Sequence, residues 1–135
     1  MESKSQSPNP NEIPTPNSQP GGARKPYDIR ERTFEFAVRV LNIAGAMPNE
    51  GGGRMLASQL SRSGTSVGAN VEEADGAVTR ADKRKTLIVA RKEVREARYW
   101  LRLLDRMGTK IPVREEIAEA TELLYILSAI IDKLQ

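Results

Sequence analysis

From Asp28 onward, apolar residues recur at helical spacing, and this pattern predicts four helices. The first should begin at a capping box formed by Asp28 and Glu31 and end near Met47, because Pro48 follows. Two apolar rows run along it: Phe34, Val38, Leu41 and Gly45, and Phe36, Val40, Ile43 and Met47.

The second helix is expected from about Gly53 to Ala74, with Leu56, Leu60, Val67, Val71 and Ala74 on one face. Gly64 and Gly68 lie in its middle, where each glycine costs about 1 kcal/mol relative to alanine. We therefore expect another helix backbone to approach closely there. A polar row borders the core: Gln59, Ser63, Ser66 and Asn70. We interpret this row as buried hydrogen bonding, within the bundle or between subunits.

The third helix should open at a second capping box, Thr79 and Asp82, and run to about Met107, before Gly108. Pro112 is predicted at the first position of the fourth helix, with Glu115 and Glu116 in its first turn. The fourth helix also carries two apolar rows: Val113, Ile117, Ala120, Leu124, Leu127, Ile131 and Leu134, and Leu123, Ile126 and Ile130.

Four helices joined by short connections predict an all-α fold, an antiparallel up-down-up-down four-helix bundle over residues 27–135. Residues 1–26 contain six of the eight prolines and little to bury, so we expect a disordered tail there. Two apolar rows on the first and last helices exceed what one small core needs, which favours a homo-oligomer; the alternative is an unusually wide monomer core.

The composition excludes much chemistry. The 135 residues include no Cys and no His, which removes thiolate nucleophiles, the usual general base and the commonest metal ligand. We therefore predict a protein that is not an enzyme and has no cofactor or metal. Glu72, Glu73 and Asp75 are acidic residues at a helix end, and we expect them to be solvated. The chain has no apolar leader or membrane-length apolar stretch, so a cytoplasmic location is expected.

The net charge of +3 is mild, but the positive charge is concentrated in the third helix, which holds ten Lys or Arg against four Asp or Glu between Thr79 and Met107. Seven arginines lie within about 40° of one line along that helix. They are Arg80, Arg84, Arg91, Arg95, Arg98, Arg102 and Arg106. Tyr99 flanks this line, and Trp100 borders the apolar face.

An arginine stripe of this kind has three interpretations. It suits the phosphates of a nucleic acid, because the guanidinium fork donates two hydrogen bonds at once. It equally suits an acidic protein partner. The third interpretation is pairing with acidic residues of the fourth helix or of a neighbouring subunit; those available are Glu115, Glu116, Glu119, Glu122 and Asp132.

Two segments carry a family resemblance: the second-helix run from Gln59 to Ala74 (QLSRSGTSVGANVEEA) and the third-helix run from Lys92 to Leu101 (KEVREARYWL). They resemble the bacterial four-helix-bundle proteins encoded in 23S rRNA intervening sequences, over roughly residues 28–134. That family is similar in fold to the accessory variability proteins of diversity-generating retroelements, which are homopentameric and basic and bind nucleic acid and a reverse transcriptase. Lys83 departs from the pattern, since the family often has Phe there.

The resemblance implies a homopentamer and no catalytic residues. Our leading hypothesis is a homo-oligomeric nucleic-acid-binding or adaptor protein that contacts RNA or DNA through the seven arginines, with a reverse transcriptase or another protein as a further partner. The alternative is an interaction scaffold whose arginines meet an acidic partner or neighbouring subunits. The residues expected to build the packing or subunit interface are Gln59, Ser63, Gly64, Ser66, Gly68, Asn70, Tyr99 and Trp100.

Overall fold

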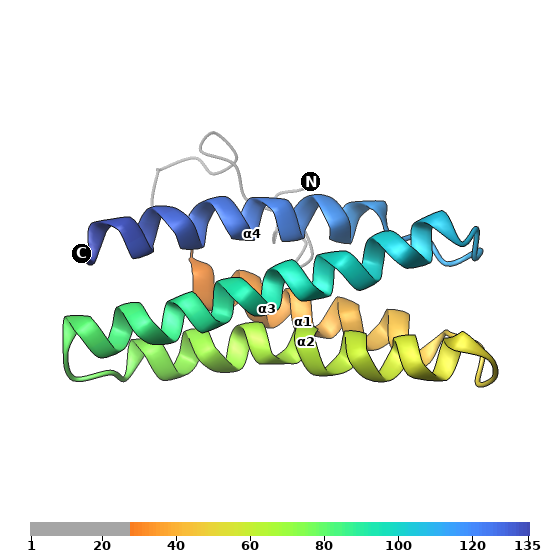
Figure 1. Cartoon of the computed structure of the whole chain (residues 1–135), viewed down its shortest axis with the longest axis horizontal. Helices are drawn as coiled ribbons and strands as arrows, with labels where there is room; N and C mark the ends of the chain where they lie inside the picture. The colour runs from red at the N-terminus through yellow and green to blue at the C-terminus, as the bar shows by residue number, and fades with distance from the viewer. Residues whose placement is uncertain (1–27) are drawn as a thin grey trace, which may run out of the picture.

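The computed structural model describes residues 28–135, and the predicted tail of residues 1–26 lies outside them. The described residues form four helices and no strands: α1 (Ile29–Gly45), α2 (Gly52–Asp75), α3 (Arg80–Arg106) and α4 (Arg114–Lys133). Consecutive helices run in opposite directions (Figure 1). The all-α antiparallel four-helix bundle predicted from the sequence is confirmed.

Local chemistry sets two of the helix starts as predicted. The Asp28 carboxylate accepts a hydrogen bond from the Glu31 backbone N–H at 3.4 Å, and the Thr79 hydroxyl accepts one from the Asp82 N–H at 3.0 Å. The predicted start of α4 is wrong. Val113, not Pro112, occupies the cap position, and its φ of −134° lies outside the helical range, so the helix begins only at Arg114.

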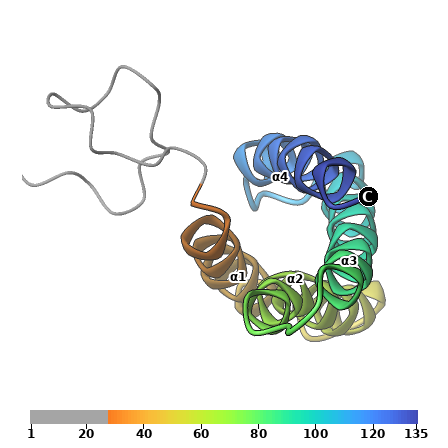
Figure 2. The same ribbon diagram turned by 90° about the vertical axis from the view of Figure 1, so that its left-hand side faces the viewer.

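The four helices follow one another around an arc, with α4 returning toward α1 (Figure 2). α2 packs against both α1 and α3, α3 packs against α4, and the contact between α1 and α4 is the sparsest. The core takes large side chains from every helix, among them Phe36, Leu60, Leu101 and Leu127. The hydrophobic face predicted for the second helix is the buried one.

The close approach expected at the two glycines of α2 is made by α1. A Cβ added to Gly64 would lie 2.5 Å from Cγ1 of Val40, and one added to Gly68 would lie 3.3 Å from the Thr33 carbonyl oxygen. The small residues therefore allow α1 to lie directly on α2.

The two apolar rows behave differently on α1 and α4. On α1 the row of Phe36, Val40 and Ile43 is buried, whereas Phe34, Val38 and Leu41 are exposed. On α4 both rows are at least partly buried, and its exposed large apolar side chain is Tyr125. The apolar surplus that suggested an oligomer therefore lies on α1 alone. We call Phe34, Val38 and Leu41 the outer row of α1.

Candidate nucleic-acid interface

The structure divides the seven predicted arginines of α3 into two groups. The inner arginines donate hydrogen bonds to α4; they are Arg80, Arg84, Arg91 and Arg98. The outer arginines are Arg95, Arg102 and Arg106, which are exposed and make no hydrogen bond or ion pair with other residues of the described bundle.

The inner arginines bind successive positions of α4. Arg80 Nη2 donates to the Lys133 carbonyl at 2.7 Å, and Arg84 Nε donates to the Ile131 carbonyl at 3.2 Å. These carbonyls belong to the last turn of α4, where the helix dipole favours a cation. Farther along, Arg91 Nη1 donates to Ser128 Oγ at 3.2 Å, and Arg98 Nη1 donates to Thr121 Oγ1 at 3.1 Å. This group joins α3 to α4.

The acceptors on α4 are not the carboxylates considered from the sequence. The four inner arginines donate their hydrogen bonds to carbonyl and hydroxyl oxygens of α4. Glu119 of α4 instead pairs with Arg32 of α1 at 2.7 Å. The intramolecular form of the carboxylate-pairing interpretation is therefore wrong for these four residues. The reason is positional, since the inner arginines lie against the end of α4 and its small hydroxyl side chains.

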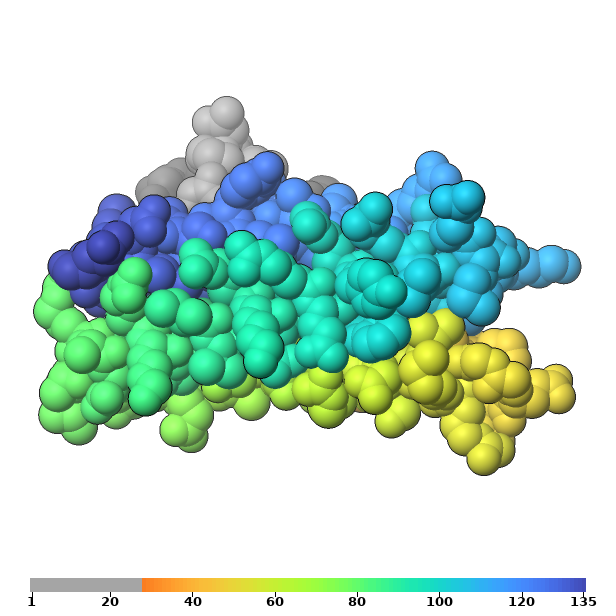
Figure 3. Space-filling model, in the orientation of Figure 1, coloured from red at the N-terminus to blue at the C-terminus, as the bar shows by residue number. Residues whose placement is uncertain are grey.

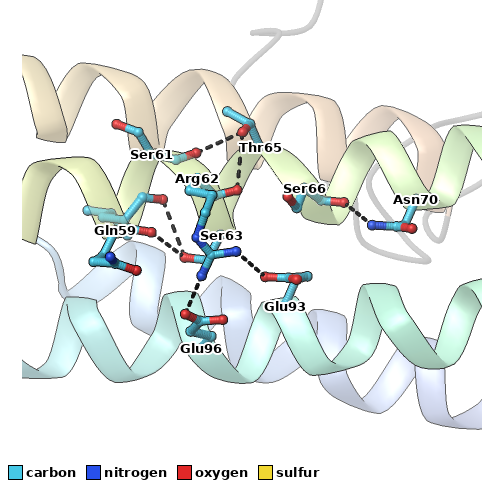
Figure 4. A network of polar contacts seen from close by, with 10 residues as sticks. Gln59, Ser61, Arg62, Ser63, Thr65, Ser66, Asn70, Glu93 and Glu96 are labelled. Atoms are coloured by element: carbon cyan, nitrogen blue, oxygen red, sulfur yellow. Dashed lines mark hydrogen bonds and ion pairs between the residues drawn. The ribbon is translucent and has the colours of Figure 1, made fainter.

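The acidic side chains in the middle of α3 face away from the outer arginines. Glu93 and Glu96 both turn toward Arg62 of α2, and Figure 4 shows the Arg62 guanidinium between them. The hydrogen bond to Glu96 raises the pKa of Arg62 above its ordinary value. Farther along α3, Asp105 lies 3.4 Å from Nε of Arg114. Glu93 and Glu96 thus share Arg62, and Asp105 pairs with Arg114, so none of the three carboxylates forms an ion pair with an outer arginine.

The outer arginines therefore lie on a basic face of α3 where no residue of the described bundle forms an ion pair with them. α3 crosses the middle of one side of the molecule, between α4 and α2 (Figure 3). Lys92 is exposed on the same helix, about 60° from Arg95 around the axis. Tyr99 is 53% exposed beside the outer arginines, and Trp100 is partly buried against the core. We call Lys92, Arg95, Tyr99, Arg102 and Arg106 the outer face of α3.

Lys92 and Arg62 were not among the residues predicted from the sequence. The signal for Lys92 was its angular position near Arg95. For Arg62 the signal was the pair Glu93 and Glu96, which lie three residues apart and therefore share a helix side that needs a cation.

Two side chains of the polar row of α2, those of Ser63 and Asn70, donate hydrogen bonds to carbonyls of their own helix (Figure 4). Ser63 Oγ donates to the Gln59 carbonyl at 3.0 Å, and Asn70 Nδ2 donates to the Ser66 carbonyl at 2.8 Å. Ser63 is buried, while the other three are partly buried. The role of these four residues at a subunit interface stays a prediction.

The acidic end of α2 is engaged with α1. Arg30 lies 3.1 Å from Glu72 and 3.5 Å from Asp75, and the Glu72 hydrogen bond raises the pKa of Arg30. Within residues 28–135, acidic side chains form no cluster of three or more suited to a metal ion. No helix in this part of the chain has the length and hydropathy to span a membrane.

Comparison with known proteins relates the chain to a family model and to a solved structure. The family model described as 23S rRNA-intervening sequence protein matches residues 25–132. The fold is similar to the crystal structure of a protein of unknown function from the S23 ribosomal protein family of Bacteroides thetaiotaomicron. That similarity has 38% sequence identity and a TM-score of 0.71, and covers 76% of this chain and 97% of the other. No curated protein matches the chain significantly.

Proposed function

The chain belongs to the 23S rRNA-intervening sequence protein family, and from this premise we propose that it is a homo-oligomeric nucleic-acid-binding or adaptor protein without catalytic activity. The nucleic acid lies along the outer face of α3. A cytoplasmic protein of this kind contacts the phosphate backbone, so its binding is strong at low salt and largely independent of sequence.

The observation that carries the proposal is the state of the outer arginines. Arg95, Arg102 and Arg106 are exposed and unpaired within the described bundle, while the carboxylates in the middle and at the end of α3 have other partners. At about 1.5 Å rise per residue, the three arginines extend over about 16 Å of helix. Like charges held this close repel one another, and a polyanion relieves that repulsion. The inner arginines add positive potential but are already bound to α4.

The outer row of α1 supports the homo-oligomer. Phe34 and Leu41 are 63% and 48% exposed, and Val38 lies between them on the same helix face. A row of large apolar side chains on the surface is typical of a protein–protein contact. Five subunits, a relation to the accessory proteins of retroelements and a reverse transcriptase partner are proposed from the family resemblance. The Bacteroides relative comes from a ribosomal protein family, which supports RNA as the first polyanion to test.

A second function, a scaffold for acidic proteins, is favoured by the same unpaired arginines, because a carboxylate also accepts the guanidinium fork. The acidic protein would bind the outer arginines through a few carboxylates. RNA and DNA would then displace it only weakly from these arginines.

The test is binding of generic RNA and DNA, measured by fluorescence anisotropy at two salt concentrations, for wild type and the double variant Arg95→Gln, Arg102→Gln. The double variant Arg54→Gln, Lys133→Gln is the control, because it removes the same charge from exposed positions elsewhere. We expect weaker binding only for the α3 variant. Equal binding by the two variants overturns the proposed interface, and absence of binding by wild type overturns the nucleic-acid function.

A further inference from the structure

Tyr99 lies within the outer face of α3. At about 100° per residue, Arg95, Tyr99, Arg102 and Arg106 all fall within about 60° of one another around the helix. The Tyr99 ring is 53% exposed. It contacts Trp100 with ring centroids 5.1 Å apart and planes at 71°, an edge-to-face geometry. This contact occupies at most one face of the tyrosine ring.

A shallow hollow of about 350 Å³ lies beside this ring. Its lining is Tyr99, Arg102, Leu103, Asp105 and Arg106. The volume is at the lower end of the range for small-ligand sites, about 300 to 1,000 Å³. The hollow joins an aromatic ring to two arginines that have no partner in the described bundle, and its one carboxylate, Asp105, lies 3.4 Å from Arg114 Nε. An aromatic surface next to fixed positive charge is the chemistry that binds an unpaired nucleotide.

We propose that the outer face of α3 binds single-stranded nucleic acid in preference to duplex, with a base stacked on Tyr99. This inference rests on the proposed function and adds the strandedness of the ligand. Arg102 and Arg106 hold the phosphate next to the stacked base, and Arg95, one turn away on the other side of Tyr99, holds the neighbouring phosphate. A duplex offers the same phosphates but keeps its bases stacked on each other, so Tyr99 adds nothing to its affinity.

The chain provides a matched control and an internal reporter. Tyr125 on α4 is 70% exposed and lies outside the outer face, so Tyr125→Leu makes the same change away from the site. Trp100 is the only tryptophan, and its ring touches Tyr99. A base stacked on Tyr99 should therefore change the fluorescence of Trp100.

The experiment compares a mixed-sequence RNA strand with the duplex that it forms with its complement, using wild type, Tyr99→Leu, Tyr99→Phe and Tyr125→Leu. Loss of one stacked base should weaken single-strand binding by about 5- to 150-fold in Tyr99→Leu. Duplex binding by this variant should stay unchanged. Tyr99→Phe and Tyr125→Leu should bind the single strand like wild type, and the single strand should alter Trp100 emission more than the duplex does.

Three results would overturn the inference. Equal affinity of Tyr99→Leu and wild type for the single strand, with binding still lost in Arg95→Gln, Arg102→Gln, leaves the proposed function standing and removes the stacking site. A change of oligomer mass in Tyr99→Leu, measured by light scattering, assigns Tyr99 to a subunit interface instead. Failure of wild type to bind either RNA removes both proposals together.

Discussion

Arg32 of α1 and Glu119 of α4 form a two-point ion pair inside the bundle. Arg32 Nε donates to Glu119 Oε2 at 3.0 Å, and Nη2 donates to Oε1 at 2.7 Å. The two residues are 7% and 4% exposed. They join the first and last helices, whose contact is the sparsest in the bundle. The geometry fixes α1 against α4 at one register, because a bidentate pair tolerates little sliding.

Removal of one member of the Arg32–Glu119 pair should lower the free energy of unfolding. In Glu119→Gln a guanidinium loses its buried countercharge, and we expect a loss of about 3 to 5 kcal/mol of unfolding free energy. Urea denaturation at fixed protein concentration measures it. Replacement of both partners, Arg32→Met with Glu119→Leu, should recover much of the loss, since no buried charge remains. Arg30→Gln, which breaks an exposed pair, is the control and should leave the midpoint nearly unchanged. A midpoint of Glu119→Gln equal to wild type would show that the pair contributes little.

A methyl group added at Gly64 should separate α1 from α2. Its Cβ would lie 2.5 Å from Cγ1 of Val40, and overpacking of this kind costs about 1 to 3 kcal/mol. This cost should exceed the gain of about 1 kcal/mol in helix propensity. Gly45→Ala is the matched control, because no atom lies within 4 Å of its added Cβ, and thermal unfolding should show it as stable as wild type or more so. Adding Val40→Ala to Gly64→Ala should restore part of the lost stability. If the stability of the double variant is no higher than that of Gly64→Ala, the added methyl group clashes with a residue other than Val40.

The features predicted correctly from the sequence depend on residues near each other in the chain. Asp28 and Thr79 cap their helices through contacts three residues away. Gly64 predicts a close approach because a glycine in the middle of a helix lowers its stability unless a neighbouring helix packs against it. The partner of Arg32 is 87 residues away, and it depends on how α1 and α4 are rotated toward each other, which hydrophobic periodicity does not specify.

The division of the α3 arginines into an inner and an outer group shows a second limit of prediction from the sequence. Arg84 and Arg102 lie at about the same angle on α3, so the helical wheel treats them alike. Arg84 nevertheless binds the Ile131 carbonyl, because the last turn of α4 ends beside it, whereas Arg102 is exposed. The axial position of a neighbouring helix end decides between them, and this position follows from the packing of the whole bundle.

The outer row of α1 should control assembly. The double variant Phe34→Glu, Leu41→Glu places two charges on that row, and burial of unpaired charge in an interface is strongly unfavourable. We expect light scattering at micromolar concentration to show an oligomer for wild type and a smaller species for the variant, with unchanged helicity by circular dichroism. Val78→Glu is the control, because Val78 is 95% exposed between α2 and α3. A wild-type monomer, or a variant with the wild-type mass, would contradict the role of this row.

The inner and outer arginines should respond to mutation in opposite ways. Arg84→Gln with Arg91→Gln removes hydrogen bonds to α4, and because both side chains are only partly buried we expect a loss of about 1 kcal/mol each in unfolding free energy. Nucleic-acid affinity should change little, since these guanidinium groups are already occupied. Arg95→Gln with Arg102→Gln should leave stability unchanged and reduce the dependence of log affinity on log salt by about 0.7 per lost phosphate contact on a single strand.

Measuring both properties for both variants makes the outcome decisive. Lower stability in the inner variant together with a lower salt slope in the outer variant is what the structure predicts. Of the two groups, the outer arginines are the ones that bind no other residue of the described bundle and can therefore release counterions from a nucleic acid. If the outer variant instead dissociates into smaller species while its residual binding keeps the wild-type salt slope, these arginines pair with carboxylates of a neighbouring subunit. The polyanion would then have to bind elsewhere on the bundle.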